Sequence, residues 1–274
     1  MPYDLSSRLV LGVASSALFD LSISQQIFDE HGVEEYRRYQ EEQIDSPLDK
    51  GVAFPFIRRL LGLNDLDPSN PPVEVFVLSK NSPETGLRVM RSIKHHGLPV
   101  SRAIFNSGES PYRYMRPLGM SLFLSADERD VKHAIDMGLA AGRVMAGSND
   151  DDASRDLRIA FDFDGVLSDD SSEKYYGEAE DLLDYLEREE RLREDPISPG
   201  PLKQFLADIN RIQALERDLS SSDPGYSARL HVSLITARNA PAHERAVRSL
   251  KDWGVSVDSA FFLGALTKAS SLAS

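Results

Sequence analysis

An internal repeat constrains the fold of this chain more than any other feature of its sequence. Residues 88–105 (RVMRSIKHHGLPVSRAIF) align with residues 245–262 (RAVRSLKDWGVSVDSAFF) at an offset of 157, with eight identical positions. Helix and strand periodicity impose matching apolar positions on unrelated segments, but they do not impose matching Arg, Ser, Lys and Gly residues. The identities include Arg88/Arg245, Ser92/Ser249, Lys94/Lys251 and Gly97/Gly254. The repeat therefore predicts two halves with one architecture.

Two shorter matches extend the repeat toward the beginning of each half. Residues 51–57 (GVAFPFI) align with residues 200–206 (GPLKQFL) at an offset of 149, and residues 14–19 (ASSALF) align with residues 162–167 (DFDGVL) at an offset of 148. The change from 149 to 157 requires eight additional residues in the second copy. The polar loop around residues 220–225 (SSSDPG) is the expected place for this insertion.

Short apolar runs alternate with amphipathic stretches along the whole chain. The predicted strands are 9–14, 73–78, 121–124, 157–163, 231–235 and 260–263, and the predicted helices include 82–96, 130–145, 201–219 and 241–253. Such alternation favours parallel strands covered by helices on both faces. We therefore expect an α/β protein with a Rossmann-like parallel sheet in each half, 1–150 and 155–274, joined by a small acidic linker at 146–155.

The composition excludes several classes of protein. The chain has 31 basic and 44 acidic residues, a net charge of −13, which argues against binding a nucleic-acid polymer but leaves room for a pocket that holds one phosphorylated ligand. The absence of cysteine excludes disulfides and thiolate chemistry. No apolar run is long enough to span a membrane, and the first residues do not form a secretory signal. We expect a cytoplasmic protein without membrane partners.

A pair of carboxylates follows one of the predicted strands. Residues 157–161 lead directly into Asp162, which is followed by Asp164 and by Gly165. Strand alternation directs both carboxylates to one side, at the carboxyl end of the strand, where open α/β sheets bind ligands. Two carboxylates this close favour a bound cation, and Mg²⁺ accepts one or two carboxylates together with phosphate oxygens. A carboxylate can also attack phosphorus and form an aspartyl phosphate.

Two simpler interpretations of these carboxylates compete with that chemistry. The interpretation that the carboxylates belong to an acidic loop that only caps the following helix stays open. A calcium loop is excluded by spacing, because an EF-hand places glycine at the sixth position of its loop and Gly165 is the fourth residue here.

The segment 162–166 (DFDGV) resembles the first motif of the haloacid-dehalogenase-like (HAD) phosphatases. The resemblance implies that Asp162 is the nucleophile, that Asp164 is the general acid and base, and that both contribute to the Mg²⁺ site. Thr236, in 234–238 (LITAR), matches the second motif and would hydrogen-bond the phosphoryl group. Lys268 matches the lysine of the third motif and would neutralise charge at the phosphate, and Arg238 is a further candidate for substrate binding.

Further strings resemble the cytosolic 5'-nucleotidase type I family across nearly the whole chain. They are 13–20 (VASSALFD), 32–40 (GVEEYRRYQ), 53–56 (AFPF), 124–127 (LSAD), 198–203 (SPGPLK) and 250–254 (LKDWG). This resemblance implies hydrolysis of nucleoside 5'-monophosphates such as AMP to nucleoside and phosphate, with Mg²⁺ as cofactor and an aspartyl-phosphate intermediate. It also implies helical cap-like insertions between the first two motifs, where residues 178–194 form a predicted amphipathic helix.

One departure from the HAD pattern concerns the fourth motif, an acidic pair that completes the metal site. At the offset of 157, the residues that correspond to Ser125–Asp127 of the first half would be 282–284, and the fourth motif is expected there. The sequence ends at Ser274. We therefore expect either a truncated chain or a metal site completed from elsewhere.

The first half lacks the residues that the chemistry requires. Ala14 and Ser16 match Asp162 and Asp164, and Pro111 matches Lys268, so this half is expected to be a degenerate, non-catalytic HAD-like unit. A packing role is favoured. A dimer surface in a homo-oligomer and a nucleotide-binding wall are the alternatives, and Ser15 and Ser16, with Asn81, are the candidate substrate-binding residues of such a wall.

Two other functions stay open at this point. One is a HAD phosphatase for other small phosphomonoesters, and the other is a non-catalytic nucleotide-binding or regulatory protein. A nucleoside monophosphate is the expected small-molecule partner in the favoured interpretation.

Overall fold

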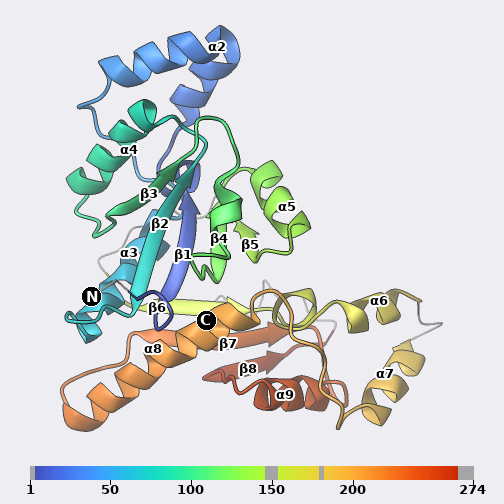
Figure 1. Ribbon diagram of the computed structural model, residues 1–274. Coiled ribbons are helices and arrows are strands. Elements are labelled where there is room, and N and C mark those ends of the chain that lie inside the picture. The colour runs from blue at the N-terminus through green and yellow to red at the C-terminus, as the bar shows by residue number, and fades with distance from the viewer. Residues whose placement is uncertain (1–3, 146–153, 179–181, 265–274) are drawn as a thin grey trace. The chain divides into compact units, whose positions relative to one another are not determined.

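The computed structural model describes residues 4–145, 154–178 and 182–264 (Figure 1). The chain divides into two compact units, Met1–Arg155 and Asp156–Ser274, which we call the first and the second unit. Each unit is built on a parallel sheet with helices, which confirms the α/β class predicted from the sequence. None of the helices within the described ranges is both long enough and apolar enough to cross a membrane.

The first unit contains a five-stranded parallel sheet in the order β3-β2-β1-β4-β5. Its strands are β1 (Leu9–Ala14), β2 (Val73–Ser79), β3 (Arg102–Phe105), β4 (Leu122–Ser125) and β5 (Ala141–Arg143). Every residue of β1 and β2 is buried, as expected for central parallel strands covered on both faces. The strand order reverses between β1 and β4, so the carboxyl ends of these strands flank the crevice where sheets of this type bind ligands.

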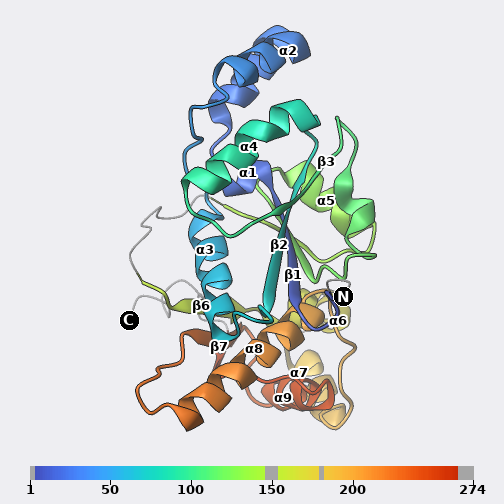
Figure 2. The same cartoon turned by 60° about the vertical axis from the view of Figure 1, so that its left-hand side comes forward.

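Helices connect and cover these strands. They are α1 (Ser15–Leu18), α2 (Ser22–Glu42), α3 (Phe54–Gly62), α4 (Pro83–His95) and α5 (Glu128–Asp136), with 3₁₀ turns η1 (Leu63–Leu66) and η2 (Pro111–Tyr114). Helix α3 packs on β2, as the turned view also shows, and α5 packs on β4 and β5 (Figure 2). The Ser82 hydroxyl caps α4 by accepting a hydrogen bond from the Thr85 amide at 3.3 Å.

The predicted helix at 130–145 is wrong in its second half. Helix α5 ends at Asp136, because Gly138 adopts a φ of +69° and the Leu139 amide donates back to the Ala134 carbonyl at 3.0 Å. This glycine-terminated end releases the chain to form β5, the short edge strand that the apolar pattern did not reveal.

The second unit contains a three-stranded parallel sheet in the order β6-β7-β8. Its strands are β6 (Leu157–Phe161), β7 (Leu230–Thr236) and β8 (Ser259–Phe262). Its helices are η3 (Phe163–Leu167), α6 (Ser171–Glu178), α7 (Leu182–Arg191), α8 (Lys203–Ser222) and α9 (His243–Asp252). Strand β7 lies in the centre, with its residues nearest the carboxyl end buried.

The two sheets share strand order and register. Leu9 of β1 pairs with Val73 of β2, and Leu157 of β6 pairs with Leu230 of β7. Leu157 is the counterpart of Leu9 at an offset of 148, and Leu230 is the counterpart of Val73 at an offset of 157. Strands β6-β7-β8 therefore follow the same parallel order as β1-β2-β3.

Side-chain contacts around the helices also recur in the two units. The Ser92 Oγ accepts from the Leu48 amide and the Ser249 Oγ accepts from the Ile197 amide, each at 2.9 Å. Arg88 Nε donates to the Ser46 carbonyl, and its counterpart Arg245 Nε donates to the Asp195 carbonyl. The His96 ring nitrogen forms a hydrogen bond with the Leu48 carbonyl, and the Trp253 indole N–H donates to the Ile197 carbonyl.

Candidate functional site

The predicted carboxylates lie at the carboxyl end of β6. Asp162 follows the last residue of this strand, and its Oδ1 accepts a hydrogen bond from the Phe163 amide at 2.8 Å. Phe163 is fully buried and stacks on the Trp253 ring, with centroids 5.9 Å apart. Gly165 turns the chain with a φ of +70°, a conformation that favours glycine. The buried ring thus anchors the loop between Asp162 and Asp164.

Both carboxylates line one cavity of about 370 Å³ within the second unit. The other charged or polar residues that line it include Glu173, Tyr185, Arg238 and Asn239. The structure therefore brings together residues from the end of β6, from α6 and α7, and from the loop after β7. Arg238 and Asn239 follow β7 as Asp162 follows β6, so adjacent strand ends supply the site.

Arg238 holds the Asp164 carboxylate in a two-point contact. Its Nη2 donates to Asp164 Oδ1 at 2.7 Å and its Nε donates to Asp164 Oδ2 at 2.9 Å. The Arg238 side chain is only 1% exposed, and its guanidinium lies over the Phe163 ring, 5.1 Å from the centroid. Such paired contacts fix the plane of the carboxylate as well as its position.

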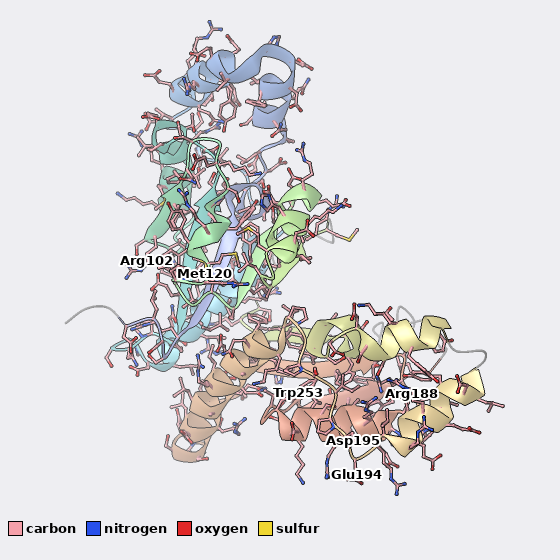
Figure 3. The ribbon with its side chains drawn as sticks, turned by 45° about the vertical axis from the view of Figure 1, so that its right-hand side comes forward. Arg102, Met120, Arg188, Glu194, Asp195 and Trp253 are labelled. Atoms are coloured by element: carbon pink, nitrogen blue, oxygen red, sulfur yellow. The ribbon has the colours of Figure 1, made fainter. Side chains whose placement is uncertain are left out.

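A buried carboxylate on α7 binds the opposite side of the same guanidinium. Glu189 has a fully buried side chain and accepts from Arg238 Nη1 at 2.7 Å and from Arg245 Nη1 at 2.9 Å. It also accepts a hydrogen bond from the Ser172 hydroxyl at 3.1 Å. Arg188, the preceding residue of α7 and labelled in Figure 3, lies 3.3 Å from the Glu189 carboxylate. Glu189 therefore ties α6 and α7 to the residues that surround Asp164.

Glu189 and Arg245 did not stand out in the sequence as site residues. Glu189 lies in a run of charged residues, 187–194 (EREERLRE), in which the helical pattern predicts solvent exposure. The identity Arg88/Arg245 in the repeat was the available signal, because an arginine matched in both copies needs a partner in both. In the first unit that partner is Gln40, which accepts from Arg88 Nη1 at 3.2 Å.

Burial and charge set the protonation of two groups in the cavity. Burial raises the pKa of Tyr185 to about 12, so its hydroxyl remains a hydrogen-bond donor at neutral pH. Burial opposes the charged form of Arg238, but the hydrogen bonds and the charge of Asp164 outweigh it and raise the pKa of Arg238. Arg238 is therefore a permanent cation at this site.

The remaining predicted site residues occupy different places. Thr236 is fully buried at the end of β7, where its Oγ1 accepts from the Arg238 amide at 3.1 Å. Lys268 lies outside the described residues. Ser15 and Ser16 line a cavity within the first unit instead, together with Asn81.

The comparisons with known proteins agree on one family. A family model described as 5'-nucleotidase matches residues 1–274. Human cytosolic 5'-nucleotidase 1B is 29% identical to this chain over 269 residues, a match that covers 96% of the chain and 43% of the human protein. The chain thus spans less than half the length of this relative. No solved structure matches.

A match along the whole chain, with the paired carboxylates of β6 in one cavity, leads to a single assignment: the chain belongs to the 5'-nucleotidase family.

Proposed function

We propose that this chain is a Mg²⁺-dependent 5'-nucleotidase that hydrolyses nucleoside 5'-monophosphates such as AMP to nucleoside and phosphate. One observation carries the proposal: Asp162 and Asp164 line the same cavity at the carboxyl end of a parallel strand, in a member of the 5'-nucleotidase family. The human relative is named as a cytosolic 5'-nucleotidase, which supports the substrate class and a cytoplasmic location.

In the proposed reaction, Asp162 acts as the nucleophile and Asp164 as the acid and base. An Asp162 carboxylate oxygen attacks phosphorus, the bond from phosphorus to the ribose 5'-oxygen breaks, and protonated Asp164 gives its proton to that oxygen. A water molecule then attacks phosphorus, Asp164 takes the proton of this water, and phosphate leaves with release of the Asp162 carboxylate. The two displacements divide one difficult hydrolysis into two easier steps.

Arg238 fixes the position of Asp164, and one of its two contacts has to open before an Asp164 oxygen carries the proton of the first step. Its contacts to Asp164, Glu189 and the Ala242 carbonyl use four of its five N–H groups. The fifth, on Nη2, has no acceptor within the described part of the chain. That group is available to a phosphoryl oxygen, which supports the prediction that Arg238 also contacts substrate.

Thr236 and Lys268 complete the proposed phosphate contacts. Thr236 is proposed to hydrogen-bond the phosphoryl group, as the resemblance to the second motif implies. Its fully buried side chain accepts from the Arg238 amide through Oγ1 and lies outside the cavity lining, so this contact requires the substrate to reach the end of β7 beside Arg238. Lys268 is proposed to neutralise phosphate charge, as the resemblance to the third motif implies.

The donor set in this cavity fits Mg²⁺. Carboxylate oxygens are the ligands that this ion prefers, and it needs only one or two of them besides water and phosphate oxygens. Asp162 and Asp164 are the residues proposed to hold it, with the Asp164 carboxylate shared with Arg238. When bound, Mg²⁺ would neutralise charge on the transferring phosphoryl group.

We further propose that the two units arose by duplication and that the first unit is non-catalytic. The shared register and the recurring Ser92/Ser249 and Arg88/Arg245 contacts support a duplication, because packing alone does not dictate such polar contacts. Ala14 and Ser16 replace the two carboxylates in the first unit, which therefore lacks a nucleophile.

A comparison of two substrates tests the proposal. With Mg²⁺, kcat/KM for AMP should exceed that for ribose 5-phosphate by at least about a hundredfold, because contacts to the base stabilise the transition state only in the nucleotide. EDTA should abolish phosphate release from both. Equal rates on the two substrates would instead indicate a general phosphomonoesterase. Binding of AMP without phosphate release would indicate a nucleotide-binding protein.

A further inference from the structure

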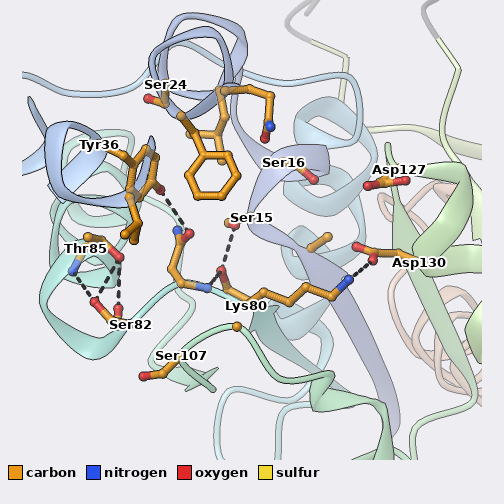
Figure 4. A pocket seen from close by; sticks show the side chains of 18 of the residues that line it. Ser15, Ser16, Ser24, Tyr36, Lys80, Ser82, Thr85, Ser107, Asp127 and Asp130 are labelled. Carbon is orange, nitrogen blue, oxygen red and sulfur yellow. Dashed lines mark hydrogen bonds and ion pairs between the residues drawn. The ribbon is translucent and has the colours of Figure 1, made fainter. Parts of the chain in front are cut away.

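The first unit contains a larger cavity at the carboxyl ends of its own strands. Its volume is about 540 Å³, and its lining includes Ser16 after β1, Asn81 after β2 and Asp127 after β4 (Figure 4). These strand ends flank the position where the strand order reverses, at which sheets of this type bind ligands. The first unit therefore has an open cavity at the ends of its strands, which a purely structural role would not require.

This cavity occupies the positions of the candidate catalytic cavity in the other unit. Each described residue that lines the catalytic cavity has a counterpart at an offset of 148, 149 or 157 that lines this one. Ser16 corresponds to Asp164, Tyr36 to Tyr185, and Asn81 to Arg238. The space that would receive a nucleotide in the second unit is thus retained in the first.

Two positions that carry charge in the catalytic cavity are neutral in this lining. Ser16 and Asn81 stand where the second unit has a carboxylate and a guanidinium. Among the described residues that line the cavity, three are cations and each is paired with a carboxylate: Lys80 with Asp130 at 2.5 Å, Arg129 with Asp127 at 3.0 Å, and Arg37 with Glu34 at 3.1 Å. An entering phosphate would have to compete with a carboxylate for each of these cations, which weakens the attraction of the cavity for an anion.

An aromatic surface and an oriented amide remain for recognition. The Phe28 side chain lines the cavity, is 45% exposed, and contacts the Tyr36 ring edge to face at 5.9 Å. The Tyr36 hydroxyl donates to Asn81 Oδ1 at 3.0 Å, which turns the Asn81 NH₂ group away from Tyr36. Burial raises the pKa of Tyr36, so this donor persists at neutral and mildly alkaline pH.

We propose that the cavity of the first unit binds an uncharged nucleoside. Its base would stack on Phe28 and accept hydrogen bonds from the Asn81 NH₂ group, and its ribose hydroxyls would meet the Ser16 and Ser82 hydroxyls. The choice of a nucleoside rests on the proposed function, since the reaction in the second unit would release one. The described residues that line this cavity all belong to the first unit, and those that line the catalytic cavity all belong to the second.

Calorimetric titration of the full chain with adenosine tests this site. Phe28→Ala should weaken adenosine binding at least tenfold, because it removes the stacking surface, and Asn81→Asp should weaken it by replacing donors with acceptors. Ile23→Ala is the matched control: Ile23 lies on the same helix, is 64% exposed and is outside the cavity lining, so affinity should not change. Circular dichroism would confirm that each variant is folded.

The outcomes separate this site from the proposed nucleotidase reaction. Unchanged adenosine affinity in both Phe28→Ala and Asn81→Asp would overturn the nucleoside site, whatever the activity of the protein. Tighter binding of inorganic phosphate than of adenosine, lost in Lys80→Ala, would overturn it in favour of an anion site. The unchanged protein could bind adenosine, lose that binding in Phe28→Ala, and yet release no phosphate from AMP. This result would support the nucleoside site and contradict only the nucleotidase assignment.

Discussion

Replacing Asp162 with asparagine should lower Mg²⁺-dependent phosphate release from AMP by at least about a thousandfold. The amide has nearly the shape of the carboxylate and can still accept from the Phe163 amide, as Asp162 Oδ1 does at 2.8 Å. It cannot attack phosphorus, so the loss should appear in kcat. A phosphate-release assay with saturating AMP measures this directly.

Asp170→Asn is the matched control for that variant. Asp170 lies eight residues after Asp162 on the same connection, has a side chain 55% exposed and pairs with Lys174 at 2.9 Å. The same change of charge there should leave kcat within about twofold, since exposed ion pairs contribute little. Equal losses in the two variants would point to a general effect of charge, and full activity of Asp162→Asn would exclude Asp162 as the nucleophile.

Replacing Glu189 with glutamine should destabilise the second unit by about 3 kcal/mol. Glu189 is fully buried between Arg238 and Arg245, and removal of its charge leaves two buried guanidinium groups with one compensating carboxylate, that of Asp164. Denaturant unfolding followed by Trp253 fluorescence reports on this unit, because Trp253 is the only tryptophan of the chain and stacks on Phe163.

Glu194→Gln provides the comparison for Glu189→Gln. Glu194 has a side chain 70% exposed and pairs with Arg248 at 2.8 Å, so its replacement should change the free energy of unfolding by less than about 0.5 kcal/mol. A Glu189→Gln protein as stable as Glu194→Gln would mean that the buried cluster does not hold α7 against the site.

The sequence was sufficient to predict the strands that carry the site and the carboxylate pair itself. Strand positions depend on local apolar runs, and Asp162 and Asp164 follow such a run directly, so local pattern and chemistry point to the same loop. The repeat predicted two halves with one architecture, and the strand order β1-β2-β3 recurs in β6-β7-β8.

The Glu189 cluster and β5 could not be predicted in the same way. Glu187 and Glu190 are exposed while Glu189 between them is buried, and the difference comes from Arg238 and Arg245, which lie about fifty residues further along the chain. Strand β5 has three residues, too few for a periodic pattern, and it depends on a glycine that ends α5. The Glu189 cluster thus arises from tertiary context that local sequence does not encode, whereas Gly138 was a local signal for the end of α5.

Trapping of the covalent intermediate tests the central claim most directly. During turnover of AMP with Mg²⁺, an acid quench followed by hydroxylamine should convert an aspartyl phosphate into a hydroxamate, because the hydroxylamine nitrogen attacks the acyl carbon and displaces phosphate. Peptide mass spectrometry should then find the hydroxamate at Asp162 and not at Asp164. A hydroxamate at another residue, or its absence from protein that is releasing phosphate from AMP, would contradict nucleophilic catalysis by Asp162.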